Sequence, residues 1–98
     1  SIDDHLSKLD EPVKNLLQEI RTFVLSLGTN VIEEVRPHRI VYSKSFTLRT
    51  FLDVEPATSM LVISIKSRLR DPATKLTISS SDQLANLKEL VSRAYASI

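Results

Sequence analysis

The chain contains no cysteine and only one glycine, Gly28. Without cysteine it can form no disulfide, no thiolate zinc site and no cysteine nucleophile. With a single glycine it cannot build the glycine-rich loops of Walker-type or dinucleotide-binding sites. It also lacks the run of roughly 20 apolar residues that a membrane-spanning helix needs, and its first residues do not form a signal-peptide pattern. We therefore expect a cytoplasmic protein with no membrane partner.

The size and composition are those of one ordinary domain. A chain of 98 residues with 42% apolar and 26% charged side chains can bury one core but not two separate ones. No repeat, linker or low-complexity segment divides it. We expect a single domain over residues 1–98, either a monomer or a weak homodimer.

Charge is distributed unevenly along the chain, although the formal net charge is only +1. Residues 1–35 contain seven acidic and three basic side chains, a net charge of −4. Residues 36–75 contain eight basic and three acidic side chains, a net charge of +5. An acidic leading helix and a basic middle segment predict a domain with two electrostatically different faces.

Two amphipathic helices are predicted, one near each end of the chain. The first begins at Asp10, a good N-cap residue, and apolar residues then recur every three or four positions. Gly28 stands where a left-handed C′ residue ends a helix. The closing helix follows Ser80, which has the spacing of a capping box with Gln83. Residues 2–9 form a short helical turn before both.

The segment between the helices reads as a sheet. The run from Phe46 to Val54 alternates, which predicts that Phe46 and Leu48 share one face while Arg49 and Phe51 lie on the other. Residues 55–58 read as a turn, and residues 71–72 break the chain. Strands are predicted at 31–35, which Pro37 restricts to an edge, and at 39–43, 46–54, 60–66 and 76–79.

These elements predict a two-layer α+β sandwich of order α-β(4–5)-α. Each helix offers one apolar stripe, so both helices are expected to pack on one face of the sheet. The connections between strands are short, which favours a mostly antiparallel meander over parallel crossovers.

Four stretches of the chain carry a family resemblance. The runs HLSKLDEPVKNLLQEIRTFVLSLG, RIVYSK, FLDVEP and DQLANLKELVSRAYASI resemble a small prokaryotic α+β domain of unknown function. Members are sometimes labelled predicted transport proteins, and they occur alone or at the C-terminus of larger chains, including nuclease-like ones. The resemblance implies an α+β fold and an accessory role, and it supplies no catalytic residues. Family members carry a longer, glycine-rich insertion where this chain has only residues 66–75.

Basic side chains between the helices form the main candidate site. If they share the open face of the sheet, they form a patch suited to phosphate backbones, with Phe51 and Tyr42 available to stack on a base. The alternative is that these charges keep a solvated sheet face and its edges soluble. The candidate nucleic-acid-binding residues are Arg36, His38, Arg39, Lys44, Arg49, Lys66, Arg68, Arg70 and Lys75.

Other polar groups make weaker sites. The two histidines, His5 and His38, lack a metal-ligand spacing, so no metal is expected. Asp53 and Glu55 could act as an acid–base pair or hold a divalent cation, but exposed acids at a strand end are more simply explained by pairing with Arg49 or Lys66 across the sheet. The serine cluster at 79–81 fits a helix cap and lacks the nucleophile-elbow pattern. We expect no catalytic residue and no cofactor.

The leading hypothesis is a non-enzymatic accessory module, either a binding platform or an interaction domain; in its more specific form, the basic sheet face contacts nucleic acid. Its motivation is the net charge of +5 on residues 36–75, together with the nuclease-linked members of the resembled family. The alternative is a protein–protein interaction or dimerisation domain that uses an exposed edge strand or a helical face.

Overall fold

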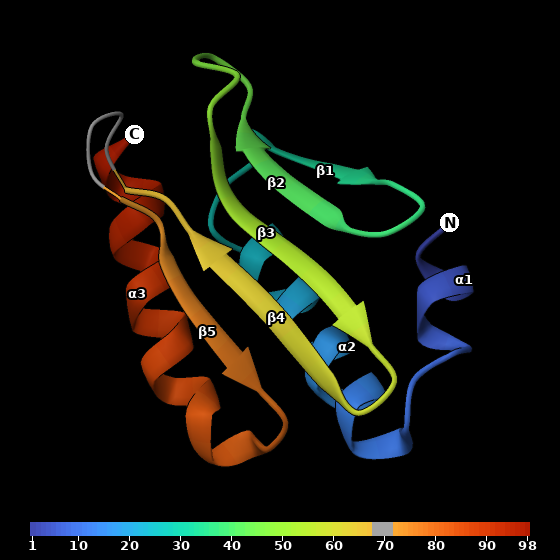
Figure 1. The fold of residues 1–98 in the computed structure, drawn as a ribbon. Coiled ribbons are helices and arrows are strands. Elements are labelled where there is room, and N and C mark those ends of the chain that lie inside the picture. The colour runs from blue at the N-terminus through green and yellow to red at the C-terminus, as the bar shows by residue number, and fades with distance from the viewer. Residues whose placement is uncertain (68–71) are drawn as a thin grey trace.

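The sheet is an antiparallel meander in which each strand pairs with the next along the chain. This architecture is seen in a computed structural model that describes residues 1–67 and 72–98 (Figure 1). The predicted strand 31–35 is confirmed as an edge strand. The strands are β1 (Val31–Val35), β2 (Ile40–Lys44), β3 (Thr50–Ala57), β4 (Met60–Ile65) and β5 (Thr74–Ile78).

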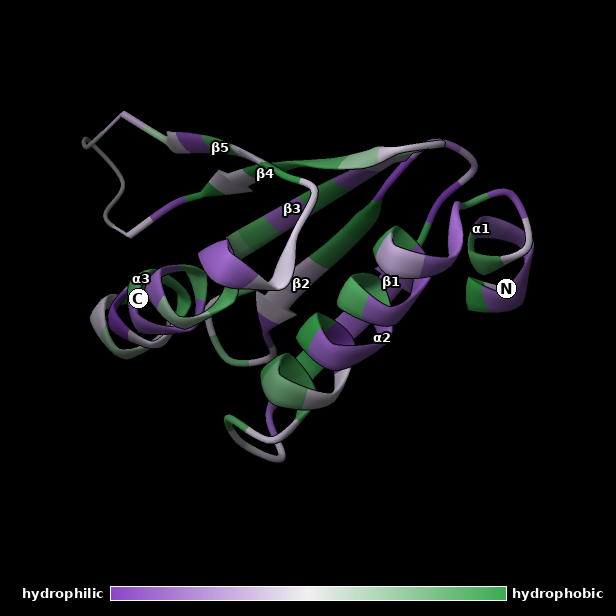
Figure 2. Cartoon of the chain, turned by 90° about the horizontal axis from the view of Figure 1, so that it is seen from below, coloured by the Kyte–Doolittle hydropathy of each residue, from purple (hydrophilic) through white to green (hydrophobic). Residues whose placement is uncertain are grey.

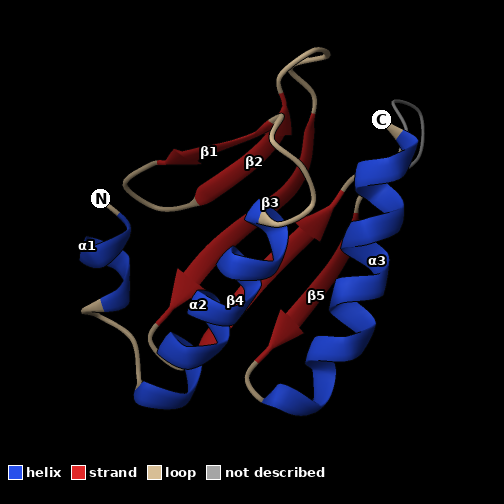
Figure 3. Ribbon diagram, turned by 180° about the vertical axis from the view of Figure 1, so that it is seen from behind, coloured by secondary structure: helices blue, strands red, loops and turns tan. Residues whose placement is uncertain are grey.

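The two long helices lie on the same face of this sheet, as the sequence predicts (Figures 2 and 3). The structure is therefore an α+β fold with helices before and after a five-stranded sheet. No helix in the described part of the chain is long and apolar enough to cross a membrane. The helical elements are α1 (Ile2–Leu6), α2 (Glu11–Leu25), the 3-10 turn η1 (Ser81–Gln83) and α3 (Leu84–Ser97).

The core lies between the sheet and the stripes of α2 and α3. Every second residue of the inner strands points toward the helices and is buried. Burying one such side chain contributes about 1.5–3 kcal/mol, so these layers account for most of the stabilisation. The fully buried members include Leu17, Ile20 and Val24 of α2, Ile40 and Tyr42 of β2, Leu52 and Val54 of β3, Leu61 and Ile63 of β4, and Ile78 of β5.

The prediction for Gly28 is wrong. Helix α2 ends at Leu25, and Gly28 does not have a positive φ. A Cβ at position 28 would collide with the hydroxyl of Tyr95 and lie 2.8 Å from Oδ1 of Asn30. The glycine therefore leaves room for the Tyr95 side chain of α3, and it does not terminate α2.

Asp10 and Ser80 are N-cap residues, as the sequence predicts, but neither side chain forms a capping hydrogen bond. Asp10 is the N-cap of α2, but its side chain makes no capping bond, and its backbone N–H donates to the carbonyl of Thr58 (2.9 Å). The expected capping box at Ser80 does not form. Gln83 instead accepts a hydrogen bond from the N–H of Ser79 (3.2 Å) and donates to the carbonyl of Thr77 (3.1 Å). These bonds fix the start of the closing helix to the end of β5.

The strand predicted at 46–54 begins four residues later than expected. Phe46 and Leu48 lie in the β2–β3 connection, which a hydrogen bond from Leu48 N–H to the Lys44 carbonyl closes (2.7 Å). Leu48 has φ 55°, a left-handed conformation that ends the alternation. A register shift after Tyr42 then turns Phe51 inward together with its neighbour Leu52.

The turn predicted at 55–58 is shifted toward the C-terminus. Residues 55–57 belong to β3, and Pro56 pairs with Leu61 of β4. The pairing of β2 with β3 extends only to Val54, so the missing N–H of Pro56 removes no bond to β2. The chain turns at Thr58 and Ser59 instead. The predicted break at 71–72 begins outside the described residues.

Candidate functional site

The predicted basic residues do not form one continuous patch over the open face of the sheet, the face opposite the helices. Two of its predicted cations are held by carboxylates at the end of the sheet where β1 turns into β2. Arg36 donates to both carboxylate oxygens of Glu34 (3.1 and 3.0 Å). Arg39 reaches Asp53 at 2.9 Å and Glu55 at 3.0 Å. Two guanidinium groups thus meet three carboxylates at this end, which leaves no excess of positive charge there.

The same contacts correct the predicted partners of Asp53 and Glu55. Their carboxylates pair with Arg39, and not with Arg49 or Lys66, because β2 lies beside β3 with Val41 opposite Asp53. Both acids thus serve as acceptors for one guanidinium. Within residues 1–67 and 72–98, no group of three or more His, Asp or Glu side chains could hold a metal ion.

Two further candidate nucleic-acid-binding residues lie away from the open face. His38 is exposed in the connection between β1 and β2. Lys44 turns toward the helix side, where its Nζ donates to the Ile98 carbonyl (3.0 Å) and lies 4.3 Å from the centre of the Tyr95 ring. Lys44 is therefore engaged in holding the end of α3.

Three of the candidate residues gather at the opposite end of the sheet. Arg49 is exposed at the start of β3, Lys66 follows β4, and Lys75 lies on β5 beside Ser64. The alternation of the strands places Lys75 and Ser64 on the open face, because their neighbours Leu76 and Ile63 pack into the core. The predicted residues Arg68 and Arg70 lie outside the described residues.

The aromatic side chains expected to stack on a base are buried. Phe51 and Tyr42 are fully buried, and the Phe51 ring meets Tyr95 edge-on with 5.3 Å between ring centres. The exposed aromatic is instead Phe46, in the β2–β3 connection beside exposed Leu48. Because apolar and polar residues alternate from Phe46 onward, the sequence does not show that Phe46 and Leu48 lie in a connection and not in a strand. The connection contains no glycine, asparagine or proline to mark a turn.

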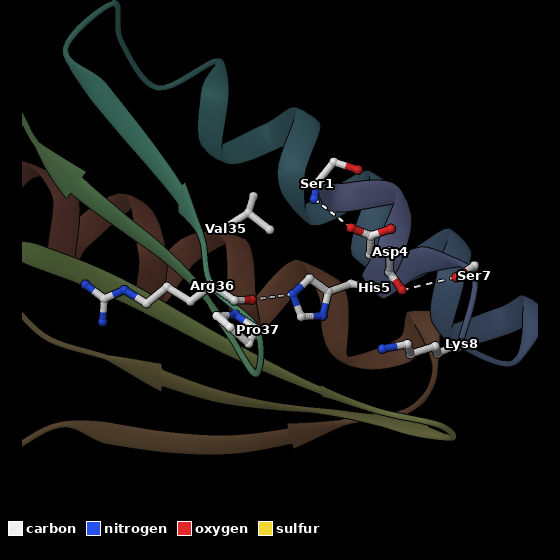
Figure 4. A pocket seen from close by; sticks show the side chains of 8 residues that line it. All are labelled: Ser1, Asp4, His5, Ser7, Lys8, Val35, Arg36 and Pro37. Atoms are coloured by element: carbon white, nitrogen blue, oxygen red, sulfur yellow. Dashed lines mark hydrogen bonds and ion pairs between the residues drawn. The ribbon is translucent and has the colours of Figure 1, made fainter.

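A polar pocket of about 480 Å³ lies between α1 and the β1–β2 connection (Figure 4). His5 is buried there, and its Nε2–H donates to the carbonyl of Arg36 (2.7 Å). The bond fastens α1 to the β1–β2 connection. The pocket is lined by Ser1, Asp4, His5, Ser7, Lys8, Val35, Arg36 and Pro37.

Glu33 forms a partly buried polar junction between α2 and β1. Arg21 donates to both oxygens of the Glu33 carboxylate (2.8 and 3.0 Å), and the hydroxyl of Tyr42 donates to it at 2.7 Å. Burial by itself raises the pKa of Glu33, but these hydrogen bonds outweigh it and hold the pKa below 4.5. Burial and the bond to Glu33 raise the pKa of Tyr42. The junction is structural, since it joins a helix to an edge strand.

Comparison with known proteins places almost the whole chain in one family. A family model described as "Domain of unknown function (DUF5655)" matches residues 2–97. No curated protein and no solved structure matches the chain.

Proposed function

The chain belongs to the family described as Domain of unknown function (DUF5655), and we propose that it is a non-catalytic module that binds nucleic acid. The contact surface is one end of the sheet, which we call the basic end. It comprises the cations Arg49, Lys66 and Lys75 and the hydroxyl groups of Ser43, Thr50 and Ser64.

The observation that carries this proposal is the uneven pairing of charge between the two ends of the sheet. Arg36 and Arg39 are paired with carboxylates at one end. In the described part of the chain, no ion pair involves Arg49, Lys66 or Lys75. Exposed cations without a carboxylate partner retain their attraction for a polyanion.

Hydroxyl groups lie between these cations. The hydroxyls of Ser43 and Thr50 are 3.2 Å apart across β2 and β3. Ser64 pairs with Lys75 across β4 and β5. Serine and threonine hydroxyls join lysine and arginine as common donors to phosphate oxygens. A nucleic-acid backbone that crosses the strands from β2 to β5 would therefore meet phosphate donors along its path.

The proposal predicts weak binding that depends strongly on salt. Three cations that each neutralise one phosphate give a slope of about −2 for a single strand, and about −2.7 for a duplex, in a plot of the logarithm of the binding constant against the logarithm of salt concentration. Binding without base readout has dissociation constants on the order of 10⁻⁴ to 10⁻⁶ M at physiological salt.

Fluorescence anisotropy with labelled DNA and RNA oligonucleotides, at low and moderate salt, tests the proposal. The substitution Arg49→Gln is expected to weaken binding and to reduce the slope. Arg36→Gln is the matched control, because it removes the same charge from the end where Arg36 is paired with Glu34. Absence of binding at low salt, or equal effects of the two substitutions, contradicts the proposal.

A further inference from the structure

The β2–β3 connection presents two large apolar side chains to solvent. Phe46 is 92% exposed and Leu48 is 75% exposed, whereas the other exposed large apolar residues in the described part of the chain, Leu25, Ile32 and Met60, are between 37% and 41% exposed. Figures 1 and 3 show this connection projecting beyond the neighbouring strands. We call Phe46 and Leu48 the hairpin tip. With most of their surface in water, these side chains add little to the core.

The backbone of the hairpin tip is strained in addition. Leu48 has φ 55°, a region that glycine and asparagine enter easily and that a leucine enters at an energetic cost. The conformation is held by the bond from Leu48 N–H to the Lys44 carbonyl (2.7 Å). Burial of the leucine does not compensate for the cost. Residues in such strained backbone conformations cluster at sites that contact ligands.

The hairpin tip adjoins the basic end. Arg49 follows Leu48 directly, and Lys44 N–H donates to the Arg49 carbonyl (3.1 Å), so the cation sits at the base of the tip. The remaining cations and hydroxyls of the basic end extend from there across the open face. An apolar group is thus placed at one end of a row of phosphate donors.

Resting on the proposed function, we infer that the nucleic acid binds as a single strand, with an unpaired base stacked on Phe46 and covered by Leu48. Bases in a duplex are stacked on each other and expose only their edges. An unpaired base offers its flat face, which aromatic side chains bind with little regard to sequence.

Phe46 is the aromatic side chain that can provide this stacking. The chain has five aromatic residues, and only Phe46 among them is exposed. Tyr42 and Phe51 are fully buried, Tyr95 packs against Phe51, and Phe23 lies under Lys88. The sheet face itself therefore offers no aromatic stacking surface within the described residues.

The layout of the donors favours a nucleic acid over a lipid surface. A flat membrane pressed on the hairpin tip would contact the groups around it, chiefly Arg49. Lys66 instead follows β4 and Lys75 lies on β5, farther along the sheet, where a linear polyanion that leaves the tip can reach them. A chain of phosphates thus uses all three cations.

A single tryptophan at the tip reports this contact. The protein contains no tryptophan, so Phe46→Trp introduces one fluorophore at the proposed stacking position. Titration with oligo-dT is expected to quench its emission, and titration with a duplex of equal length is not. In anisotropy measurements, Phe46→Ala is expected to weaken single-strand binding about tenfold. Phe46→Leu, which keeps an apolar group without a ring, is expected to restore only part of that loss.

The salt dependence separates stacking from charge. Phe46→Ala should leave the salt slope unchanged, whereas Arg49→Gln should reduce its magnitude by about 0.7. Thermal unfolding serves as the folding control, and because Phe46 is exposed its variants should unfold like the wild type.

Each outcome bears on a distinct claim. Equal affinity for single strand and duplex, with no loss in Phe46→Ala, overturns the stacking inference and leaves the proposed function in place. A blue shift of the tryptophan emission of the Phe46→Trp variant with phosphatidylglycerol vesicles, without quenching by oligo-dT, overturns the inference in favour of a membrane contact. Failure to bind any oligonucleotide at low salt overturns both proposals.

Discussion

The hydroxyl of Tyr95 lies directly over Gly28, so close that a Cβ at position 28 has no room. The hydroxyl is held there by the hydrogen bond that it donates to Oδ1 of Asn30. The Tyr95 ring also meets Phe51 edge-on and carries Lys44 on its face. One residue of the closing helix therefore joins the α2–β1 connection, the start of β3 and the end of β2.

The substitution Gly28→Ala should destabilise the protein by about 1–3 kcal/mol, because it introduces a methyl group into occupied space. Urea unfolding measures the change. The cost should be smaller in a Tyr95→Phe background, which lacks the hydroxyl that the methyl group meets. The same cost in both backgrounds would show that Tyr95 is not the cause.

Stability should fall in acid because of Glu33. Its pKa is lower in the folded protein than the reference value of 4.5, so its contribution is complete above about pH 5.5 and is lost as the pH falls through the folded pKa. The substitution Glu33→Gln should reduce this part of the pH dependence and cost about 1–3 kcal/mol at neutral pH. Unfolding midpoints measured from pH 3 to pH 7 test it. An unchanged pH profile in the variant would contradict the assignment.

Leu48→Gly should raise stability and lower affinity. Glycine removes the left-handed strain of about 1–2 kcal/mol and adds chain entropy to the unfolded state, which leaves a net gain of about 0.5–1 kcal/mol. Single-strand binding should weaken several-fold, because the apolar cover over the base is lost. Leu48→Asn is the matched control for stability, since asparagine also tolerates this conformation but keeps a side chain. A loss of stability in both variants would mean that the leucine has a packing role.

Arg39 should matter little for stability. Its pairs with Asp53 and Glu55 are partly exposed, so Arg39→Met is expected to cost no more than about 1 kcal/mol, and the cost should shrink at high salt. Denaturant unfolding at low and high salt measures this dependence. A larger cost that salt does not change would indicate packing by the arginine stem instead of ion pairing.

Periodicity in the sequence was sufficient to predict the element order, the meander and the shared face of the two helices. The role of Gly28 could not be predicted, because it depends on Tyr95, 67 positions further along the chain. The strand boundary at 46–50 was missed because alternation continues through the connection. The inward position of Phe51 results from a register shift that local pattern does not reveal.

The grouping of the basic residues depends on topology. In a meander, successive connections lie at opposite ends of the sheet. Basic residues that follow one another in the sequence are therefore divided between the two ends. Register then decides pairing: Arg39 meets Asp53 and Glu55 of the neighbouring strand, while Arg49 meets no carboxylate among the described residues. Composition predicted the positive charge of the segment, but only the strand order shows which cations are unpaired.

The most direct test of nucleic-acid binding by the basic end is an anisotropy titration of the wild type with labelled single-stranded DNA across a range of salt concentrations. It should be repeated with the triple variant Arg49→Gln, Lys66→Gln and Lys75→Gln and with the control Arg36→Gln. Binding by the wild type with a slope of about −2, abolished in the triple variant and retained in the control, is the predicted result. No binding at low salt, or wild-type binding by the triple variant, would contradict the proposed function.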